Sequence, residues 1–554
     1  MSWAWSGLTA ASAEADTPHI QRIMLLTAHS PCLWPDDLSI GDDDGITVRF
    51  VPLRTLQAVV DFPAGEWKLR RVRGNHAMTT RHACAAAMAA MLVLVSQASH
   101  AADAALVRPT AGQLAFRDLY RELVETDTSL ATGSCTALAA KVAVRFRAAG
   151  FGDDQLTLFT DPAFPLDGGL VVTVPGTSAK AKPMLLLGHI DVVNARREDW
   201  VRDPYGFIEE GGYFYGRGTS DMKLLDAIWI DTLIRFKAEG FRPKRTIKLA
   251  LTCGEESGAR MNGAKWLAEN RPDLIAAAFA LNEGGNGTTD GHGKVLSQSM
   301  QTGEKANHNF ELQATNPGGH SSLPVDDNAI YELADALARV RALKFPVHFN
   351  DTTRTYFAKV GAARGDALGA AMARLATNPA DQSAEAIVSA DRTMNALLRT
   401  TCVATLLEGG HAANALPQRA KANVNCRIVP GEDGATTRAA LIKAIADPRV
   451  TVTPVGRVRP LAVPPPLDPR IMGPAEKLAA KHYPGVPFVP AMLAGATDAT
   501  YLGPLGIPTY GVPGPLLDPD GNGLHGLNER HSVEGAYRAR DYLHDLVKIY
   551  AAQE

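Results

Sequence analysis

Short, continuous apolar runs that alternate with helical stretches constrain the fold of this chain most. Residues 183–193 (PMLLLGHIDVV) and 246–254 (TIKLALTCG) are apolar enough for strands that are buried on both faces of a sheet. Residues 224–240 (LLDAIWIDTLIRFKAEG), which lie between these runs, have a helical pattern. Because strands that alternate with helices form mostly parallel sheets, the pattern predicts an α/β domain with a mostly parallel central sheet.

The middle of the chain has a different pattern. Residues 308–315 alternate between polar and apolar side chains, as a half-buried strand does, and residues 328–343 have helical character. Two antiparallel strands are expected in TCVATLLEGG and AKANVNCRIVPG, before the proline-rich run RPLAVPPPLDP. We therefore expect an inserted α+β domain at 303–457, which divides the α/β domain into residues 102–302 and 458–554.

The first hundred residues contain one strongly apolar run, at Ala83–Val95. This run is too short to span a bilayer, which needs about 20 residues. A positively charged start at Met78–His82 and the small residues of Ser99–Ala101 instead match a secretory signal peptide, and a buried alanine-rich helix is the alternative. We expect translation to start at Met78, residues 78–101 to direct export to the periplasm or beyond, and residues 1–77 to lie outside the fold.

The charge balance excludes one class of partner. The 554 residues include 56 Lys and Arg and 59 Asp and Glu, which gives a formal net charge of −3. A nucleic-acid-binding protein normally has a basic excess, so we expect no nucleic-acid partner. Since the apolar run near the N-terminus is too short to cross a bilayer, we also expect no stable membrane anchor.

Five short segments place histidines and carboxylates at expected strand ends or in adjoining loops. Ligand-binding groups of α/β sheets cluster outside the carboxyl ends of the strands, so this placement is informative. Two histidines with several carboxylates suit zinc, with cobalt or manganese as substitutes. No single segment is specific, but the five together favour a metal centre. The segments are Gly188–Asp191, Gly218–Asp221, Gly254–Ser257, Asn282–Gly285 and Leu524–Gly526.

These segments, together with PGGHSS, NALP and HGLNE, resemble a family of zinc metallopeptidases. This family contains glutamate carboxypeptidase, carnosinase, aminoacylase, succinyl-diaminopimelate desuccinylase and vacuolar carboxypeptidase S (peptidase family M20). The resemblance runs from about Leu114 to Glu554. It implies a catalytic domain that holds two zinc ions and a smaller inserted lid domain, which corresponds here to residues 303–457.

The resemblance also implies the metal ligands. Two histidines would bind different zinc ions, one aspartate would bridge the ions, and two glutamates would complete the separate shells. The histidines are His189 and His525, and the bridging aspartate is Asp221. The two glutamates are Glu256 and Glu283.

Two further carboxylates would act beside the metals. Asp191 would orient the imidazole of His189 by accepting its free N–H. Glu255 would be the general base, which takes a proton from the attacking water and returns it to the departing amine. Some relatives read Asp-Glu-Gly-Gly where this chain begins with Asn282, and we assign the ligand to Glu283 because Asn282 is the poorer anion.

Three lid residues resemble groups that contact the substrate in this family. His320 would stabilise the oxyanion of the tetrahedral intermediate, and in dimeric relatives this histidine reaches across from a partner subunit. Asn414 and Arg427 would contact the terminal carboxylate of the substrate, which a guanidinium fork matches well. Without the resemblance, we would expect His320 to be an exposed turn residue and Arg427 to form a salt bridge on the surface. A homodimer through the lid is left open.

Four cysteines follow residue 101. Cys402 and Cys426 lie at mirrored positions of an expected hairpin that turns around Asn414. They either pair in an oxidising compartment or remain buried thiols. Cys253 is expected to be a core residue of its strand.

The resulting hypothesis is a secreted zinc enzyme that hydrolyses an amide bond next to a free carboxylate, as a carboxypeptidase or dipeptidase does. Deacylation of N-acyl amino acids uses the same metals and is the alternative, so the substrate would be a small peptide or an N-acyl amino acid. A non-catalytic peptide-binding relative is disfavoured because Glu255 and every ligand are present. The preferred side chain, the oligomeric state and a cytosolic location remain open.

Overall fold

The computed structural model describes residues 109–256, 260–456 and 460–554, together with four short strands nearer the N-terminus. Within these residues, no helix combines the length and the apolar character that are needed to cross a membrane. The expected signal peptide at 78–101 lies outside the described residues.

The four N-terminal strands form an antiparallel sheet in the order β1-β4-β3-β2. They belong to a compact unit, Met1–Arg108, that is distinct from the unit Pro109–Glu554. The sequence led us to expect that residues 1–77 lie outside the fold, since that stretch has no sustained helical or strand period. The strands are β1 (Met24–Ala28), β2 (Ser39–Gly41), β3 (Thr47–Val51) and β4 (Leu56–Val60).

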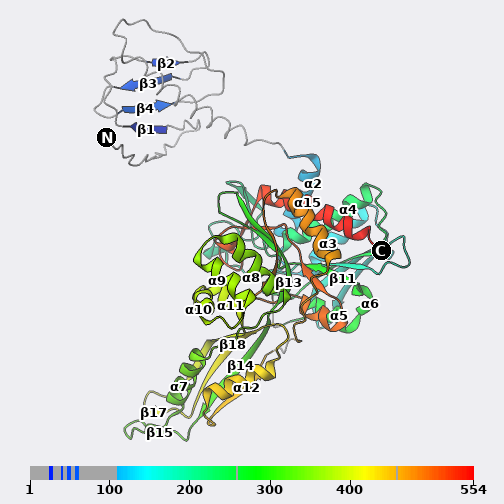
Figure 1. Ribbon diagram of the computed structural model, residues 1–554. Helices are drawn as coiled ribbons and strands as arrows, with labels where there is room; N and C mark the ends of the chain where they lie inside the picture. The colour runs from blue at the N-terminus through cyan, green and yellow to red at the C-terminus, as the bar shows by residue number, and fades with distance from the viewer. Residues whose placement is uncertain are drawn as a thin grey trace. The chain divides into compact units, whose positions relative to one another are not determined.

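The central sheet of Pro109–Glu554 has the order β22-β12-β13-β21-β11-β7-β10-β6-β5, and β20 also pairs with β13. The middle strands β10, β7, β11 and β21 pair in parallel, whereas β6 and β13 add antiparallel pairs on either side. The expected α/β class with a mostly parallel central sheet is therefore confirmed (Figure 1). The strands are β5 (Leu156–Asp161), β6 (Phe164–Val174), β7 (Met184–His189), β10 (Ile247–Thr252), β11 (Phe279–Asn282), β12 (Asn286–Thr289), β13 (Val295–Glu304), β20 (Phe488–Leu493), β21 (Thr509–Gly511) and β22 (Leu516–Leu517).

Alternate residues of the central strands face two separate hydrophobic cores. Leu186 of β7 packs in one core, with helices α2, α3, α4, α13 and α15, whereas Leu185 and Leu187 pack in the other, with α5, α6 and α14. Because successive side chains of a strand point to opposite faces, helices cover both sides of the sheet. The helices are α2 (Ala111–Glu125), α3 (Cys135–Ala148), α4 (Lys223–Ala238), α5 (Gly263–Asn270), α6 (Pro272–Ile275), α13 (Pro469–His482), α14 (Ala499–Leu502) and α15 (Val533–Ala551).

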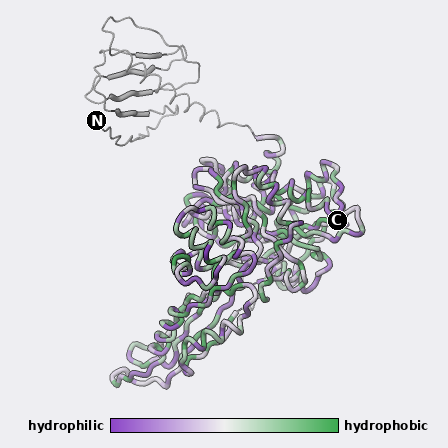
Figure 2. Tube along the Cα trace, in the orientation of Figure 1, coloured by the Kyte–Doolittle hydropathy of each residue, from purple (hydrophilic) through white to green (hydrophobic). Residues whose placement is uncertain are grey.

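The lid is an antiparallel sheet of order β16-β18-β14-β19 with helices α7 and α12. Buried residues alternate along β18, and Figure 2 shows hydrophobic and hydrophilic residues interleaved along the lid. This is the period that one buried face requires. The elements are β14 (Ala306–Thr315), α7 (Ala329–Ala342), β16 (Thr401–Gly409), β18 (Arg419–Ile428), α12 (Gly434–Ile445) and β19 (Val450–Val455).

Four helices between α7 and β16 form a separate apolar cluster. This cluster includes Met492 of β20, so the helices pack against the central sheet rather than the lid sheet. From the sequence we expected this stretch to belong to the lid, and these helices were not among the expected elements. They are α8 (Asp351–Arg364), α9 (Ala367–Thr377), α10 (Gln382–Ala390) and α11 (Arg392–Leu398).

Two disulfides join the four cysteines of Pro109–Glu554. Cys402 and Cys426 face each other across β16 and β18 and are bonded, which decides between the two alternatives that the sequence left open. Cys253 is buried, as expected, but it is also bonded to Cys135 at the start of α3. That pair is 118 residues apart in sequence, and no local pattern indicates it.

Candidate metal centre

The expected ligands lie at one edge of the parallel sheet. His189 is the last residue of β7, Glu255 and Glu256 follow β10, and Glu283 directly follows β11. The strands β10 and β11 are both parallel neighbours of β7, so their carboxyl ends meet at the same edge. This edge is where α/β sheets bind their ligands.

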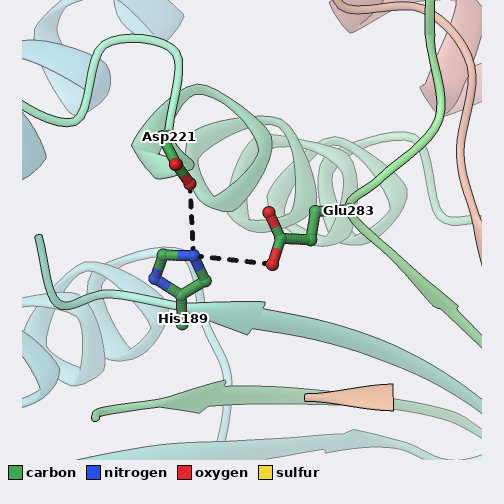
Figure 3. Close-up of side chains that lie close together, drawn as sticks. All are labelled: His189, Asp221 and Glu283. Atoms are coloured by element: carbon green, nitrogen blue, oxygen red, sulfur yellow. Dashed lines mark ion pairs between the residues drawn. The ribbon is translucent and has the colours of Figure 1, made fainter. Parts of the chain in front are cut away.

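Two groups of donor atoms gather there and share one carboxylate. The Nε2 atom of His189 lies 3.3 Å from Oδ1 of Asp221 and 3.6 Å from Oε1 of Glu283 (Figure 3). The Nε2 atom of His525 lies 3.0 Å from Oδ2 of Asp221 and 3.0 Å from Oε1 of Glu256. Asp221 therefore offers one oxygen to each imidazole, which is the position of a bridging ligand.

Asp191 contacts His189 and the backbone of Glu255 and Glu256. Its carboxylate accepts hydrogen bonds from the backbone N–H groups of Glu255, at 3.3 Å, and Glu256, at 3.1 Å. The Nδ1 atom of His189 lies 3.1 Å from the backbone carbonyl oxygen of Asp191 and 3.5 Å from its carboxylate. The carboxylate that we expected to contact this imidazole thus lies within ion-pair distance, and the backbone carbonyl of the same residue lies nearer.

Burial and crowding of acids shift the pKa values of the site. Burial, with the charges of Asp498 and Glu256, raises the pKa of Glu255 to about 8. Burial also raises the pKa of Glu283 well above its usual range, and nearby carboxylates add to the shift. Hydrogen bonds that the His525 imidazole donates to the carboxylates of Asp221 and Glu256 raise the pKa of His525 to about 10.

This donor set fits divalent cations. Buried carboxylates that repel one another are costly unless a positive charge lies between them. In each group the histidine nitrogen and carboxylate oxygens lie within 4.8 Å of one another, and such a mixed nitrogen and oxygen set suits zinc.

The backbone next to Glu255 requires glycine. Gly254 has a φ of +89°, which L side chains rarely adopt. A Cβ atom at this position would lie 1.9 Å from the carbonyl oxygen of Met261. Only glycine therefore allows the chain to turn from β10 into the Glu255–Glu256 segment.

A cavity of about 150 Å³ adjoins this segment. Its wall includes Asp191 and Glu256, the apolar side chains of Leu130 and Val192, and the charged side chain of Arg260. Apolar walls with a few polar groups are typical of small-molecule sites, so the cavity offers room for part of a substrate.

The lid residues do not all lie near the ligands. The β14–β18 ladder runs from Ala306 opposite Ile428 to Thr315 opposite Arg419, a length of about 30 Å at 3.4 Å per residue. The end at Ala306 connects to the central sheet through β13, and Arg427 lies at this end.

His320 and Asn414 lie together beyond the opposite end of the ladder. His320 belongs to β15 (Gly319–His320), which pairs with β17 (Ala415–Leu416), and the N–H of Ser321 donates to the carbonyl of Asn414 at 3.1 Å. In Figure 1 this pair of strands lies at the end of the lid farthest from β13. The structure thus separates Asn414 from Arg427, which we expected to share one substrate group.

Two carboxylates near the ligands were not expected from the sequence. Asp498 is fully buried and accepts hydrogen bonds from Asn262 and Thr252 beside Glu255. Glu529 is fully buried behind Asp221. Glu529 stands in the motif HGLNE, but a single glutamate in a loop gives no sign of burial.

Comparison with known proteins places the chain in a family. The sequence model described as "Peptidase family M20/M25/M40" matches residues 185–549. The N-fatty-acyl-amino acid synthase/hydrolase PM20D1 of Xenopus tropicalis is 30% identical over 370 residues, which cover 65% of this chain and 71% of that protein. The probable carboxypeptidase S-like 2 of Dictyostelium discoideum is 28% identical over 68% of this chain and 74% of its own length.

Solved structures share the fold at low identity. The M20 family metallo-carboxypeptidase Sso-CP2 from Sulfolobus solfataricus has a TM-score of 0.62 at 17% identity, covering 80% of this chain and all of that chain. Human carnosine dipeptidase 1 has a TM-score of 0.56 at 14% identity, with 80% and 97% covered. The family match spans the ligand-bearing strands and the lid, and the chain belongs to peptidase family M20/M25/M40.

Proposed function

We propose that this protein is a zinc-dependent hydrolase that cleaves an amide bond next to a free carboxylate, of the carboxypeptidase or dipeptidase type. One observation carries the proposal. Two groups of donor atoms share Asp221, and Glu255 lies beside them without belonging to either. A centre of this kind needs both a ligand set and a separate base.

The two groups would hold two zinc ions, for which cobalt or manganese can substitute. His189, Asp221 and Glu283 would bind one ion, and Asp221, Glu256 and His525 the other. Zinc in such a centre lowers the pKa of water and polarises the carbonyl group of the substrate.

Glu255 is the general base of the proposed reaction. Its carboxylate accepts a proton from the attacking water and donates it to the nitrogen of the departing amine. Asp191 fixes this base through the backbone, because the Glu255 N–H donates to its carboxylate. The neighbouring residue Glu256 is free to act as a ligand because Glu255 does the proton transfer.

His320 and Asn414 would act from a partner subunit. They lie about 30 Å along the lid ladder from its junction with the central sheet, so a second copy is the simple way to bring them to the ligands. The free edge strand β16 supports a lid-to-lid homodimer, since it exposes three apolar side chains. These are Val403, Leu406 and Leu407, with exposed fractions of 60%, 71% and 73%.

Arg427 is proposed to bind the free carboxylate of the substrate. It lies at the end of β18 that joins the central sheet, in register with Asn307. A guanidinium group matches a carboxylate with two parallel hydrogen bonds.

Deacylation of N-acyl amino acids is the alternative reaction. The names of two relatives favour it, the N-fatty-acyl-amino acid synthase/hydrolase PM20D1 and aminoacylase-1 of Sus scrofa, the latter 31% identical over 31% of this chain and 42% of that protein. Such substrates also have an amide bond next to a free carboxylate, so the residue roles are the same.

The bonded state of the cysteines favours a location in an oxidising compartment. We include export in the proposal, through a signal peptide at 78–101 that starts at Met78. The two disulfides of Pro109–Glu554 support it, since disulfides persist in the periplasm and outside the cell.

The test is an assay of the zinc-loaded full chain on matched panels of dipeptides and N-acyl amino acids. Each substrate is paired with its amide or ester, which lacks the free carboxylate. We expect hydrolysis of one panel and a loss of kcat/KM when the carboxylate is blocked. Equal rates on blocked and free substrates, or hydrolysis of neither panel, would contradict the proposal.

A further inference from the structure

Glu529 is a fully buried carboxylate that contacts the loop before Asp221. Its Oε1 atom accepts hydrogen bonds from the N–H groups of Ser220, at 2.7 Å, and Asp221, at 2.9 Å. Its Oε2 atom accepts from Nη1 of Arg217, at 2.7 Å, and from the N–H of Gly218, at 3.1 Å. Every partner is a donor, so the arrangement suits an ionised carboxylate.

The loop is shaped to receive this carboxylate. Gly218 has a φ of +90°, and a Cβ atom there would lie 2.8 Å from a methyl group of Val192. This left-handed turn directs successive backbone N–H groups toward one point, as in other anion-binding loops. Burial raises the pKa of Glu529, and Arg217 and the backbone N–H groups oppose that shift.

Arg217 extends the network to the loop that carries His525. Its Nη2 atom donates to the carbonyl oxygen of Gly526 at 2.6 Å, while its Nη1 atom is bound to Glu529. The same two segments also pair as strands, because β23 (Arg530–Ser532) is antiparallel to β9 (Tyr213–Tyr215). One carboxylate and one guanidinium therefore join the Asp221 loop to the His525 loop.

His525 depends on its backbone for its position. Its side chain is 57% exposed, so packing around the imidazole is slight. Its φ of +56° is left-handed, a conformation that a non-glycine residue keeps only when the surrounding structure holds it. The hydrogen bond from Arg217 to the neighbouring Gly526 provides such a constraint.

We infer that Glu529 is a positioning residue that aligns Asp221 with His525, and that the metal ion held by Asp221, Glu256 and His525 depends on it most. This second group has two of its three ligands on the loops that Glu529 joins. The group of His189, Asp221 and Glu283 has only Asp221 there. The inference rests on the proposed function, because it presumes that both groups bind metal.

The test is a titration of the metal-free full chain with Co²⁺, followed by visible absorption. In Glu529→Gln, an NH₂ group replaces one carboxylate oxygen. This new donor would face the N–H groups that the oxygen accepted from. We expect this variant to bind the first Co²⁺ within about threefold of the wild-type dissociation constant and the second about 10–100-fold more weakly. In Arg217→Lys, which cannot reach Glu529 and Gly526 together, we expect the same selective loss on a smaller scale.

The matched control is Asp231→Asn. Asp231 is another buried carboxylate. It pairs with Nε of Arg540 at 2.8 Å, between α4 and α15, and with Arg235 of α4, and neither arginine belongs to a ligand loop. We expect it to lower the melting temperature and leave both Co²⁺ steps unchanged.

Three results would overturn the inference. They are unchanged binding in a folded Glu529→Gln, an equal loss at both steps, and the same selective loss in Asp231→Asn. If Glu529→Gln does not fold, Arg217→Lys decides by the same criteria. Failure of the proposed function would appear separately, as a wild-type chain that binds Co²⁺ but hydrolyses neither substrate panel.

Discussion

The carboxylate of Asp191 accepts a hydrogen bond from the backbone N–H of Glu256 at 3.1 Å. The same carboxylate accepts the N–H of Glu255 at 3.3 Å, so one buried side chain sets both the proposed base and the ligand beside it. Its backbone carbonyl lies next to Nδ1 of His189. Asp191 thus contacts three functional groups, two through its carboxylate and one through its backbone carbonyl.

Replacement of Asp191 by Asn should disturb the two backbone hydrogen bonds that its carboxylate accepts from Glu255 and Glu256. The amide has one oxygen to accept two N–H donors, and its NH₂ group would face one of them. We expect zinc affinity or kcat to fall by about 10–100-fold, with little change in secondary structure. Zinc content after dialysis and kcat at saturating zinc check this. A variant with wild-type values for both would show that the backbone hydrogen bonds do not matter.

The disulfide Cys135–Cys253 should stabilise the protein more than Cys402–Cys426. The first closes a loop of 118 residues and the second a loop of 24, and a longer loop loses more entropy when it is closed. We expect the double Ala variant of the first pair to lose about 1 kcal/mol more than that of the second. Urea unfolding of the two variants measures the difference.

The first pair should also affect turnover. Cys253 adjoins Gly254 and Glu255, so its loss frees one side of the base-bearing segment. We expect kcat to fall in the variant that lacks Cys135–Cys253 and to stay at the wild-type value in the variant that lacks Cys402–Cys426. The reverse order in either stability or kcat would refute this account.

His531 should make the folded state sensitive to acid. Burial lowers the pKa of His531 to about 4, against an ordinary value of 6.5. Between these values the unfolded chain binds more protons, so the free energy of unfolding rises with pH. The stabilisation is complete above pH 6.5 and is lost as the pH falls toward 4, by about 3 kcal/mol at most.

Unfolding of the wild type and His531→Gln across this range isolates the effect. The wild type should lose more stability than the variant between pH 6.5 and 4, because other histidines titrate equally in both. Parallel curves for the two proteins would mean that His531 is not held neutral.

The fold was largely predictable where a short run of residues shows the type of element that it forms. The runs at 183–193 and 246–254 are mostly apolar because β7 and β10, which they contain, are buried at every position. The expected ligands came together because three of the strands that carry them are parallel neighbours. Helices α8–α11 were missed, since their packing partner β20 lies about a hundred residues later in the chain.

Other features depend on contacts that no short pattern contains. The bond between Cys135 and Cys253 and the burial of Glu529 arise only after distant segments meet. The separation of Asn414 from Arg427 follows from the length of the β14–β18 ladder. Sequence spacing alone suggested that both could reach one substrate.

The position of His320 predicts complementation between inactive variants. If His320 acts from the partner subunit, a mixed dimer of His320→Ala and Glu255→Gln contains one site with both wild-type groups. A statistical mixture should then recover about a quarter of the wild-type activity. Each variant alone should be nearly inactive. Mixing after dissociation that recovers nothing, although mixed dimers form, would place His320 in its own subunit's site.

In the proposed reaction, Glu255 transfers the proton at a metal centre to which it contributes no ligand. The direct test of this role is the zinc content and kcat of Glu255→Gln, measured on the same zinc-loaded sample. We expect wild-type zinc content with kcat lowered by about 10²–10⁴-fold. Retained turnover in the zinc-loaded variant would contradict it.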